Sequence, residues 1–388
     1  MNLTNRFNHR LAKIAVSQIR SFDQQISAIP DVIKLTLGEP DFPTPEHVKQ
    51  AGITAIEENY SHYTGMRGLP ELCEAACLFQ KERYGLVYDP QTEVLTTVGA
   101  TEAIAASLLA ILEEGDKVLI PAPAYPGYQP IVDLAGAELI TIDTSETGFI
   151  CQPEQLEAAF ATYGDSIKAI ILNYPSNPTG TLLTSEQMAK LAEVIKQRSV
   201  FVISDEVYAE LNYVGDHVSP ASYLPEQTIV ISGLSKSHAM TGWRIGFIFA
   251  QKYVIDEIIK VHQYLVTSAT TMAQKAAVEA LTTGMYDGEK MKEQYAKRRD
   301  YLLGQLSELG FEVIPPDGAF YLFCKLPKEV TLNSWEFCLQ LAEQGRVACI
   351  PGSAFEPEGE GYIRISYASS LAELTEACQR IRLFLANI

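Results

Sequence analysis

Between residues 94 and 250, short apolar runs alternate with segments in which apolar residues recur at helical spacing. Runs of this kind, separated by helices, are typical of a largely parallel sheet that is covered by helices on both faces. The predicted fold class is therefore α/β, with a mostly parallel seven-stranded sheet between layers of helices. We expect its helices at Thr101–Leu112, Gly127–Ala135, Pro153–Tyr163 and Thr184–Arg198. We expect its strands at Val94–Val98, Lys117–Ile120, Glu138–Ile142, Ile167–Leu172, Val200–Ser204, Thr228–Ile231 and Ile245–Phe249.

The residues on either side of this region follow a different pattern. Residues 1–30 read as an amphipathic segment, and a short apolar run then ends at Gly38, before a proline-rich crossing. After residue 250 the pattern predicts three helices, then short β runs between residues 312 and 366, and a closing helix at Leu371–Leu385. A chain of 388 residues is also longer than one ordinary hydrophobic core requires. We therefore predict a large domain of residues 46–284 and a small α+β domain that combines residues 1–45 with residues 285–388.

The charge of the chain limits its partners. Lys and Arg number 30 and Asp and Glu number 48, which gives a formal net charge of −18. Such a charge argues against a surface that binds nucleic acid or anionic lipid. It does not argue against an anionic cofactor, because a phosphate needs only a local positive site. The content of 47% hydrophobic residues is typical of a soluble globular protein.

The cysteines and the N-terminus indicate a cytoplasmic location. The 7 cysteines are scattered and form no Cys-x-x-Cys pair, so we expect reduced thiols and no metal site. The first residues contain no apolar signal segment. No apolar run reaches the roughly 18 residues that a membrane span needs, so no membrane partner is expected.

One stretch, Ser232–Gly246, carries the most specific chemistry. Lys236 lies among small residues just after an apolar run, and Arg244 follows eight residues later, just before the next run. A lysine in such a place can form a Schiff base if its surroundings lower its pKa. An arginine nearby can hold a phosphate by two parallel hydrogen bonds. Pyridoxal phosphate needs both groups, although a solvated lysine and a surface arginine are the plainer alternative.

Further candidates follow the expected strands, where ligands bind to parallel sheets. Gly99, Ala100 and Thr101 join the first strand to a helix, and small residues there expose backbone N–H groups to a phosphate. The alternative is an ordinary turn capped by Thr101. Tyr125 follows the second strand and could lie flat against an aromatic ring, or could simply pack beside Pro126.

Three polar residues follow the fourth and fifth strands. Asn177 lies in a turn between two X-Pro bonds, which restrict where its amide points. Asp205 comes directly off an apolar run, and a carboxylate there needs a positive partner such as a protonated pyridine nitrogen. Tyr208 would reach the same ligand from one side. Much later, Arg364 lies within an apolar strand, where its charge must be paired, either with a substrate carboxylate or with an acidic neighbour.

Taken together, these motifs resemble the class I/II pyridoxal-phosphate-dependent aminotransferases of fold type I over nearly the full chain. The similarity is greatest to the bacterial subgroup of aromatic and broad-specificity aspartate aminotransferases. The residues that carry the resemblance are Tyr63, Gly99-Ala-Thr, Tyr125, Asn177-Pro-Thr-Gly, Asp205-x-x-Tyr208, the Gly233–Gly246 stretch with Lys236 and Arg244, and Arg364.

The resemblance implies a role for each residue around the cofactor ring. Lys236 is expected to carry the cofactor covalently and to move a proton between the substrate Cα and the cofactor. Asp205 is expected to keep the pyridine nitrogen protonated. Asn177 and Tyr208 would bond the phenolic oxygen of the ring, and Tyr125 would stack on the ring.

The resemblance also implies partners for the two anionic groups. Gly99, Ala100, Thr101 and Arg244 would bind the phosphate. Many relatives have serine where this chain has Gly233, so either Ser232 or Ser235 would supply a hydroxyl. Tyr63 would reach the phosphate of a neighbouring subunit, which implies a homodimer with shared active sites. Arg364 would bind the substrate α-carboxylate, together with Asn177 and the backbone of Gly38.

The predicted substrate class depends on one position at which this chain differs from some of the proteins it resembles. Some relatives that prefer acidic substrates have lysine at the position of Thr101, which is uncharged here. We therefore expect an aromatic amino acid as donor and 2-oxoglutarate as acceptor. The alternatives are an aspartate or broad-specificity aminotransferase and a lyase that cleaves Cβ–S bonds with the same cofactor. A non-catalytic module joined to a DNA-binding segment is disfavoured, because residues 1–40 are too short and not strongly basic for one.

Overall fold

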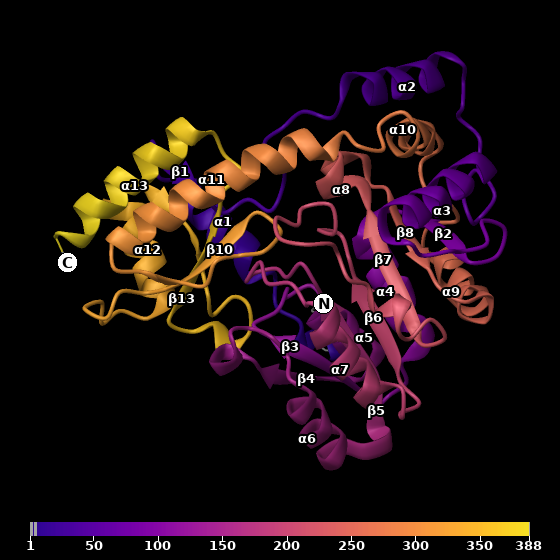
Figure 1. The fold of residues 1–388 in the computed structure, drawn as a ribbon, viewed down its shortest axis with the longest axis horizontal. Helices are drawn as coiled ribbons and strands as arrows, with labels where there is room; N and C mark the ends of the chain where they lie inside the picture. The colour runs from indigo at the N-terminus through magenta and orange to yellow at the C-terminus, as the bar shows by residue number, and fades with distance from the viewer. Residues whose placement is uncertain (1–2, 4–5, 388) are drawn as a thin grey trace.

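The computed structural model describes residue 3 and residues 6–387. Its centre is a seven-stranded sheet with the strand order β2-β8-β7-β6-β5-β3-β4 (Figure 1). All pairs are parallel except that β8 runs antiparallel to both of its neighbours. The predicted α/β class and all seven expected strands are confirmed. The strands are β2 (Val94–Thr97), β3 (Lys117–Ala122), β4 (Glu138–Asp143), β5 (Ile167–Asn173), β6 (Phe201–Asp205), β7 (Thr228–Gly233) and β8 (Gly246–Phe249).

Helices cover both faces of this sheet because its strands are apolar on both sides. In β5, Ile171 packs toward one layer of helices, whereas Ile170 and Leu172 pack toward the other. The first layer contains α4 (Gly99–Ile111), α5 (Gln129–Ala135) and α9 (Lys252–Leu265). The opposite side is covered by α3 (Pro70–Tyr84), α6 (Pro153–Tyr163), α7 (Ser185–Ile195) and α10 (Thr271–Leu281), and α2 (Glu46–Glu57) packs on α10. The short helix α8 (Leu234–Ser237) follows β7 directly.

A second unit lies beside the sheet and combines the two ends of the chain (Figure 1). A four-stranded antiparallel sheet has the order β12-β13-β10-β9, and β1 pairs in parallel with β11. These strands are β1 (Ile33–Lys34), β9 (Glu312–Val313), β10 (Tyr321–Lys325), β11 (Val347–Ala348), β12 (Ile350–Pro351) and β13 (Tyr362–Ser366). The accompanying helices are α1 (Gln18–Ile26), α11 (Gly288–Glu308), α12 (Ser334–Gln344) and α13 (Leu371–Leu385).

The core of this second unit draws on distant parts of the sequence. Phe22, Ile26 and Leu35 from the N-terminal segment pack with buried residues of α11, β10, α12 and α13. The same cluster includes Phe149 and Tyr208, which follow strands of the large sheet. The division into residues 46–284 and the two flanking segments therefore stays a prediction, because apolar packing is continuous across the proposed boundary.

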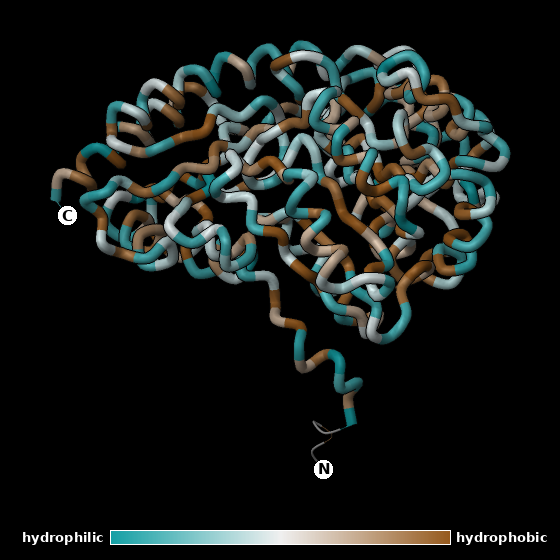
Figure 2. Tube along the Cα trace, turned by 60° about the horizontal axis from the view of Figure 1, so that its bottom comes forward, coloured by the Kyte–Doolittle hydropathy of each residue, from teal (hydrophilic) through white to brown (hydrophobic). Residues whose placement is uncertain are grey.

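The chain before α1 extends away from the body of the molecule (Figure 2). Arg10 ties it to α5, since its guanidinium donates to the carbonyl oxygen of Leu134 at 3.0 Å. Within the described part of the chain, no helix combines the length and the apolarity that crossing a membrane requires. Short 3-10 helices occur at His9–Lys13, Ser145–Thr147, Gly164–Ser166, Pro220–Ser222, Thr241–Trp243 and Pro357–Gly359.

Candidate active site

Lys236 lies in α8, immediately after the carboxyl end of β7. Its amine donates a hydrogen bond to the carbonyl oxygen of Gly38, which follows β1. Burial lowers the pKa of Lys236 to about 8, and the positive charges of Arg364 and Arg244 act in the same direction, whereas Glu39 opposes them. An amine whose pKa is this close to neutrality is available as a nucleophile and as a base.

Asp205 is the last residue of β6 and is only 4% exposed. Burial raises the pKa of Asp205 to about 6. The hydroxyl of Tyr128 donates to Oδ2 at 2.7 Å, the backbone N–H of Val207 donates to Oδ1 at 3.3 Å, and both bonds lower the pKa. These two hydrogen bonds hold the carboxylate in one orientation. No cationic side chain forms an ion pair with it in the described chain, so it is suited to pair with a cationic ring nitrogen.

Arg364 lies in β13 and is 2% exposed. Its Nη1 donates to Oδ1 of Asn177 at 2.9 Å, and its Nη2 donates to the carbonyl oxygen of Thr36 at 2.8 Å. Its Nε has no hydrogen-bond partner, and no acidic side chain pairs with it among the residues that the structure describes. The alternative that Arg364 bridges to an acidic neighbour is therefore not what the structure shows. A buried guanidinium of this kind needs an anion.

Tyr208 and Asn177 border the space between Lys236 and Arg364. The amine of Lys236 lies 5.7 Å from the centre of the Tyr208 ring. The hydroxyl of Tyr208 is hydrogen-bonded to the hydroxyl of Tyr321 at 2.7 Å. The amide oxygen of Asn177 already accepts from Arg364, so its NH₂ group remains as the donor toward a ligand.

Arg244 meets the N-terminus of α4. Gly99, the first residue of this helix, has φ of 77°, and a Cβ on it would lie 2.6 Å from Nη2 of Arg244. A Cβ on Gly246 would lie 2.6 Å from the backbone nitrogen of Ala100. Because neither glycine has a side chain, the guanidinium of Arg244 can approach the N-terminus of α4 closely. A helix N-terminus beside an arginine is suited to bind a phosphate.

The other predicted site residues differ in their burial and in their contacts. Tyr125 is partly buried, with its ring at right angles to that of Tyr128 at 5.4 Å. Thr101 is exposed on the first turn of α4, and Ser235 is partly buried next to Lys236. Tyr63 is 85% exposed, and no contact brings it to Lys236 within the described chain. Its loop is held by α10, because the Thr271 hydroxyl donates to the carbonyl oxygen of His62 at 2.7 Å.

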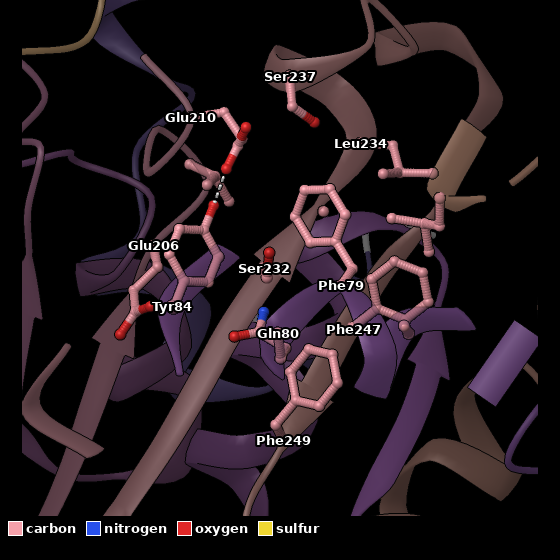
Figure 3. A pocket seen from close by; sticks show the side chains of 14 residues that line it. Phe79, Gln80, Tyr84, Glu206, Glu210, Ser232, Leu234, Ser237, Phe247 and Phe249 are labelled. Carbon is pink, nitrogen blue, oxygen red and sulfur yellow. Dashed lines mark hydrogen bonds between the residues drawn. The ribbon is translucent and has the colours of Figure 1, made fainter. Parts of the chain in front are cut away.

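Ser232 points to a different cavity. A pocket of about 340 Å³, part of it open to solvent, lies between α3 and the sheet (Figure 3). Ser232 lines it on the side of β7 where Val230 packs, whereas Asp205 lies on the opposite face with Tyr128. The pocket is lined by, among others, Phe79, Gln80, Tyr84, Glu206, Glu210 and Ser232 (Figure 3). It is therefore separate from the Lys236 group.

Comparison with known proteins identifies the family. The model of the family described as aminotransferase class I and II matches residues 30–381. This chain belongs to that family. The predicted family, the fold and the enzyme class, a pyridoxal-phosphate-dependent transaminase, are thereby confirmed.

Several named aminotransferases are similar over almost the whole chain. A probable N-acetyl-LL-diaminopimelate aminotransferase of Bacillus subtilis is 46% identical over 377 residues, which cover 97% of this chain and 95% of the relative. An aspartate aminotransferase of Pyrococcus abyssi is 38% identical over 96% of both chains. The crystal structure of an aromatic aminotransferase from Pyrococcus horikoshii is 37% identical with a TM-score of 0.88, covering 94% of this chain and 99% of that one. The relatives thus agree on transamination and differ in their named substrates.

Three residues of this aminotransferase were not predicted from the sequence. Tyr128 bonds Asp205, Tyr321 bonds Tyr208, and the backbone of Thr36 bonds Arg364. Tyr128 could have been found, because it lies three residues after Tyr125 in the same turn before α5. Tyr321 and Thr36 carry no local motif, and only the packing of the second unit against the sheet reveals them.

Proposed function

We propose that this aminotransferase moves the amino group of an L-amino acid to 2-oxoglutarate, with pyridoxal phosphate as its cofactor. The observation that carries the proposal is the grouping of Lys236, Asp205 and Arg364 around one space. There, an amine with a lowered pKa faces a buried carboxylate and a buried guanidinium with no acidic partner. Each of these three groups lacks a partner that pyridoxal phosphate and an amino acid would supply.

The residues around this space suit the cofactor. Lys236 would bind its aldehyde carbon, Asp205 its ring nitrogen, and Arg244 with the N-terminus of α4 its phosphate. When bound, the cofactor supplies an electron sink for the negative charge that develops at the substrate Cα. Two observations support this fit. The Nε of Arg364 has no hydrogen-bond partner, and the guanidinium of Arg244 lies close to Gly99 at the start of α4.

Lys236 performs the proton transfer in this proposal. With substrate and cofactor bound, the free amine of Lys236 would take the proton from the substrate Cα and would hold it for return. A pKa of about 8 leaves a useful neutral fraction at physiological pH and a conjugate acid strong enough to return the proton. The carbonyl oxygen of Gly38 orients the amine by accepting its hydrogen bond.

Asp205 would stabilise the cationic ring nitrogen as an ionised carboxylate. Its pKa of about 6 describes the carboxyl without that cation, and a positive charge opposite it lowers the pKa further. Tyr128 fixes the carboxylate, because its donated hydrogen bond persists while Asp205 is ionised. Burial and the neighbouring carboxylate raise the pKa of Tyr128 well above its ordinary value, so it remains a donor.

Arg364 binds the α-carboxylate of every substrate. Its guanidinium is held from two sides by Asn177 and the Thr36 carbonyl, which pre-organises it for a bidentate contact. The NH₂ group of Asn177, whose amide oxygen is engaged by Arg364, would donate to the phenolic oxygen of the ring or to the carboxylate. Tyr125 would stack on the ring, and Tyr208 would bond the phenolic oxygen.

Ser235 is the better of the two candidate serines for the phosphate. Ser235 neighbours Lys236 in α8, whereas Ser232 opens into the pocket of Figure 3 on the other face of the sheet. A Ser235→Ala variant should bind the cofactor more weakly, as measured by equilibrium dialysis. A Ser232→Ala variant serves as the matched control and should bind the cofactor as the wild type does.

We also propose a homodimer in a cytoplasmic setting, in which Tyr63 completes the phosphate site of the neighbouring subunit. The exposure of Tyr63 and its distance in sequence from Lys236 support this proposal. Mixing inactive Tyr63 and Lys236 variants should restore part of the activity, because a hybrid dimer retains one intact site. An active, stable monomer in sedimentation would contradict it.

For the donor we propose an aromatic amino acid, with aspartate-type donors as the second candidate. Thr101 is uncharged, and one similar structure is that of an aromatic aminotransferase. The second candidate is favoured by the 46% identical relative, whose named substrate, N-acetyl-LL-diaminopimelate, carries two carboxylates. A stopped-flow screen of donor half-reactions tests this choice: phenylalanine and tyrosine should exceed aspartate and N-acetyl-LL-diaminopimelate in kcat/KM. Pyruvate and ammonia formed without any keto acid would instead indicate a Cβ–S lyase.

A further inference from the structure

A side-chain amide ties the turn that carries Asn177 to the edge of the large sheet. β5 and β6 are neighbouring strands (Figure 1), and Asn173, the last residue of β5, lies directly opposite Asp205, the last residue of β6. Its Nδ2 donates to the carbonyl oxygen of Asp205 at 2.9 Å, and its Oδ1 accepts from the backbone N–H of Asn177 at 2.9 Å. Asn173 thus bonds the main chain of two predicted site residues.

Each of these bonds has only one possible direction. A carbonyl oxygen can only accept and a backbone N–H can only donate, so Asn173 must present its NH₂ group to Asp205 and its oxygen to Asn177. Pro175 follows two residues later and has no N–H with which to continue the strand ladder. The side chain of Asn173 therefore takes over the link between β6 and the chain beyond β5.

The other contacts of the turn close it on itself or tie its far end to the second unit. The backbone N–H of Gly180 donates to the carbonyl oxygen of Ser176 at 2.9 Å, and the carbonyl oxygen of Gly180 accepts from Gly318 at 2.8 Å. Beside the turn lies a cavity of about 300 Å³, part of it open to solvent, which Asn173 and Asn177 both line. Packing is therefore incomplete on this side, and the position of the turn depends on its hydrogen bonds.

We propose that Asn173 is a positioning residue: it places Asn177, and through it Arg364, relative to the strand end that would face the cofactor. This inference rests on the proposed function, in which Arg364 would bind the substrate α-carboxylate. Asp205 belongs to β6, which is paired on both sides with β5 and β7, so the loss of the Asn173 amide should move the turn rather than the strand. Because Oδ1 of Asn177 accepts from Nη1 of Arg364 at 2.9 Å, a displaced turn should also displace the guanidinium.

Steady-state kinetics of the Asn173→Ala and Asn173→Asp holoenzymes test the proposal. Although Asn173 lies in the large sheet, it acts through Arg364, so the loss should lie mainly in KM and less in kcat. In Asn173→Ala, KM should rise about 10-fold for phenylalanine and 2-oxoglutarate alike, the size expected for one or two lost neutral hydrogen bonds. Asn173→Asp keeps an oxygen that can accept from Asn177 and should recover part of this loss.

A second readout is independent of turnover. 3-Phenylpropionate carries a carboxylate but no amine, so it can occupy the proposed carboxylate site without reacting. In calorimetry it should bind about 10-fold more weakly to the Asn173→Ala holoenzyme than to the wild type. Asn333→Ala is the matched control, since Asn333 also bonds a backbone N–H, that of Glu336 at 2.8 Å, at the start of α12. It should cost stability as a lost helix cap does and leave KM and 3-phenylpropionate binding unchanged.

A double-mutant cycle separates positioning from a general structural effect. In the Asn177→Ala background, Asn173→Ala should change KM by less than about 2-fold, because the side chain that it positions is gone. Equal costs in both backgrounds, or a KM in Asn173→Ala within about 2-fold of the wild type, overturn the proposal. Should Asn173→Ala fail to fold, the same comparisons are made with Asn173→Asp, in which KM should rise about 3-fold. Should the wild type transfer no amino group, the proposed function fails, and the binding of 3-phenylpropionate still decides the role of Asn173.

Discussion

The edge of the seven-stranded sheet and the unit that contains β13 contribute different chemistry to the candidate site. The sheet supplies groups from turns directly after its strands, as with Asp205 after β6 and Lys236 after β7. The second unit supplies Arg364 from within a strand and the carbonyl oxygen of Gly38 from the N-terminal segment. In the proposed function, the covalent and proton-transfer chemistry would therefore belong to one unit and the recognition of the substrate α-carboxylate to the other. Variants of the first unit should mainly lower kcat, and variants of the second should mainly change KM and specificity.

Removing the amine of Lys236 should have the largest effect. Lys236→Ala loses both the nucleophile and the proton carrier, so turnover should fall by about 10³-fold or more. Reduction of the wild-type holoenzyme with borohydride, followed by peptide mapping, should locate the cofactor on Lys236. Lys260→Ala, at an exposed lysine paired with Glu257, is the control and should behave as wild type. A label on another lysine would refute the assignment.

Asp205→Ala should have the next largest effect, again on kcat. The carboxylate stabilises the ring cation most when negative charge develops at Cα, so kcat should fall about 10²- to 10³-fold, and cofactor affinity should fall less. Asp205→Glu should retain part of the activity. Steady-state kinetics and equilibrium dialysis measure the two quantities separately. A wild-type kcat in Asp205→Ala would show that this carboxylate is not part of the site.

Arg364→Lys tests the contribution of the unit that contains β13. Lysine keeps the charge but loses the two parallel donors, so KM should rise for every amino acid and keto acid alike, by about 10-fold or more. The value of kcat should change much less than in the Asp205 variants. If KM rose for dicarboxylic substrates alone, Arg364 would contact the second carboxylate instead of the α-carboxylate.

Tyr128→Phe should produce the smallest change, visible mainly as a shift in pH dependence. Its donated hydrogen bond lowers the pKa of Asp205, so its removal raises that pKa. The proposed role requires ionised Asp205, so activity is lost as pH falls through this pKa, and the acid limb of the kcat/KM profile should move to higher pH. Tyr125→Phe is a control whose hydroxyl does not bond Asp205. An acid limb at the wild-type position would show that Tyr128 does not tune the carboxylate.

Part of the fold could be predicted because the sequence patterns that specify it are local. Each strand of the large sheet is a short apolar run bounded by polar residues, and all seven were found in this way. Helix α12 was missed, although Asn333 and Glu336 form a capping box at its start and Phe337 and Leu341 are buried along it. The helix lies between short β runs, and its buried face became evident only against the core of the second unit.

The sequence by itself determined which residues are candidates for the chemistry: Lys236 and Asp205 follow apolar runs, and Arg364 lies within one. Only the tertiary structure decided how these residues are supported. Tyr128 reaches Asp205 across 77 positions, Asn177 reaches Arg364 across 187, and Thr36 reaches it across 328. Such contacts leave no local pattern, because they form where two units built from distant segments pack together. The same packing placed Ser232 on the far side of the sheet, since side-chain direction follows from which face of a strand is buried.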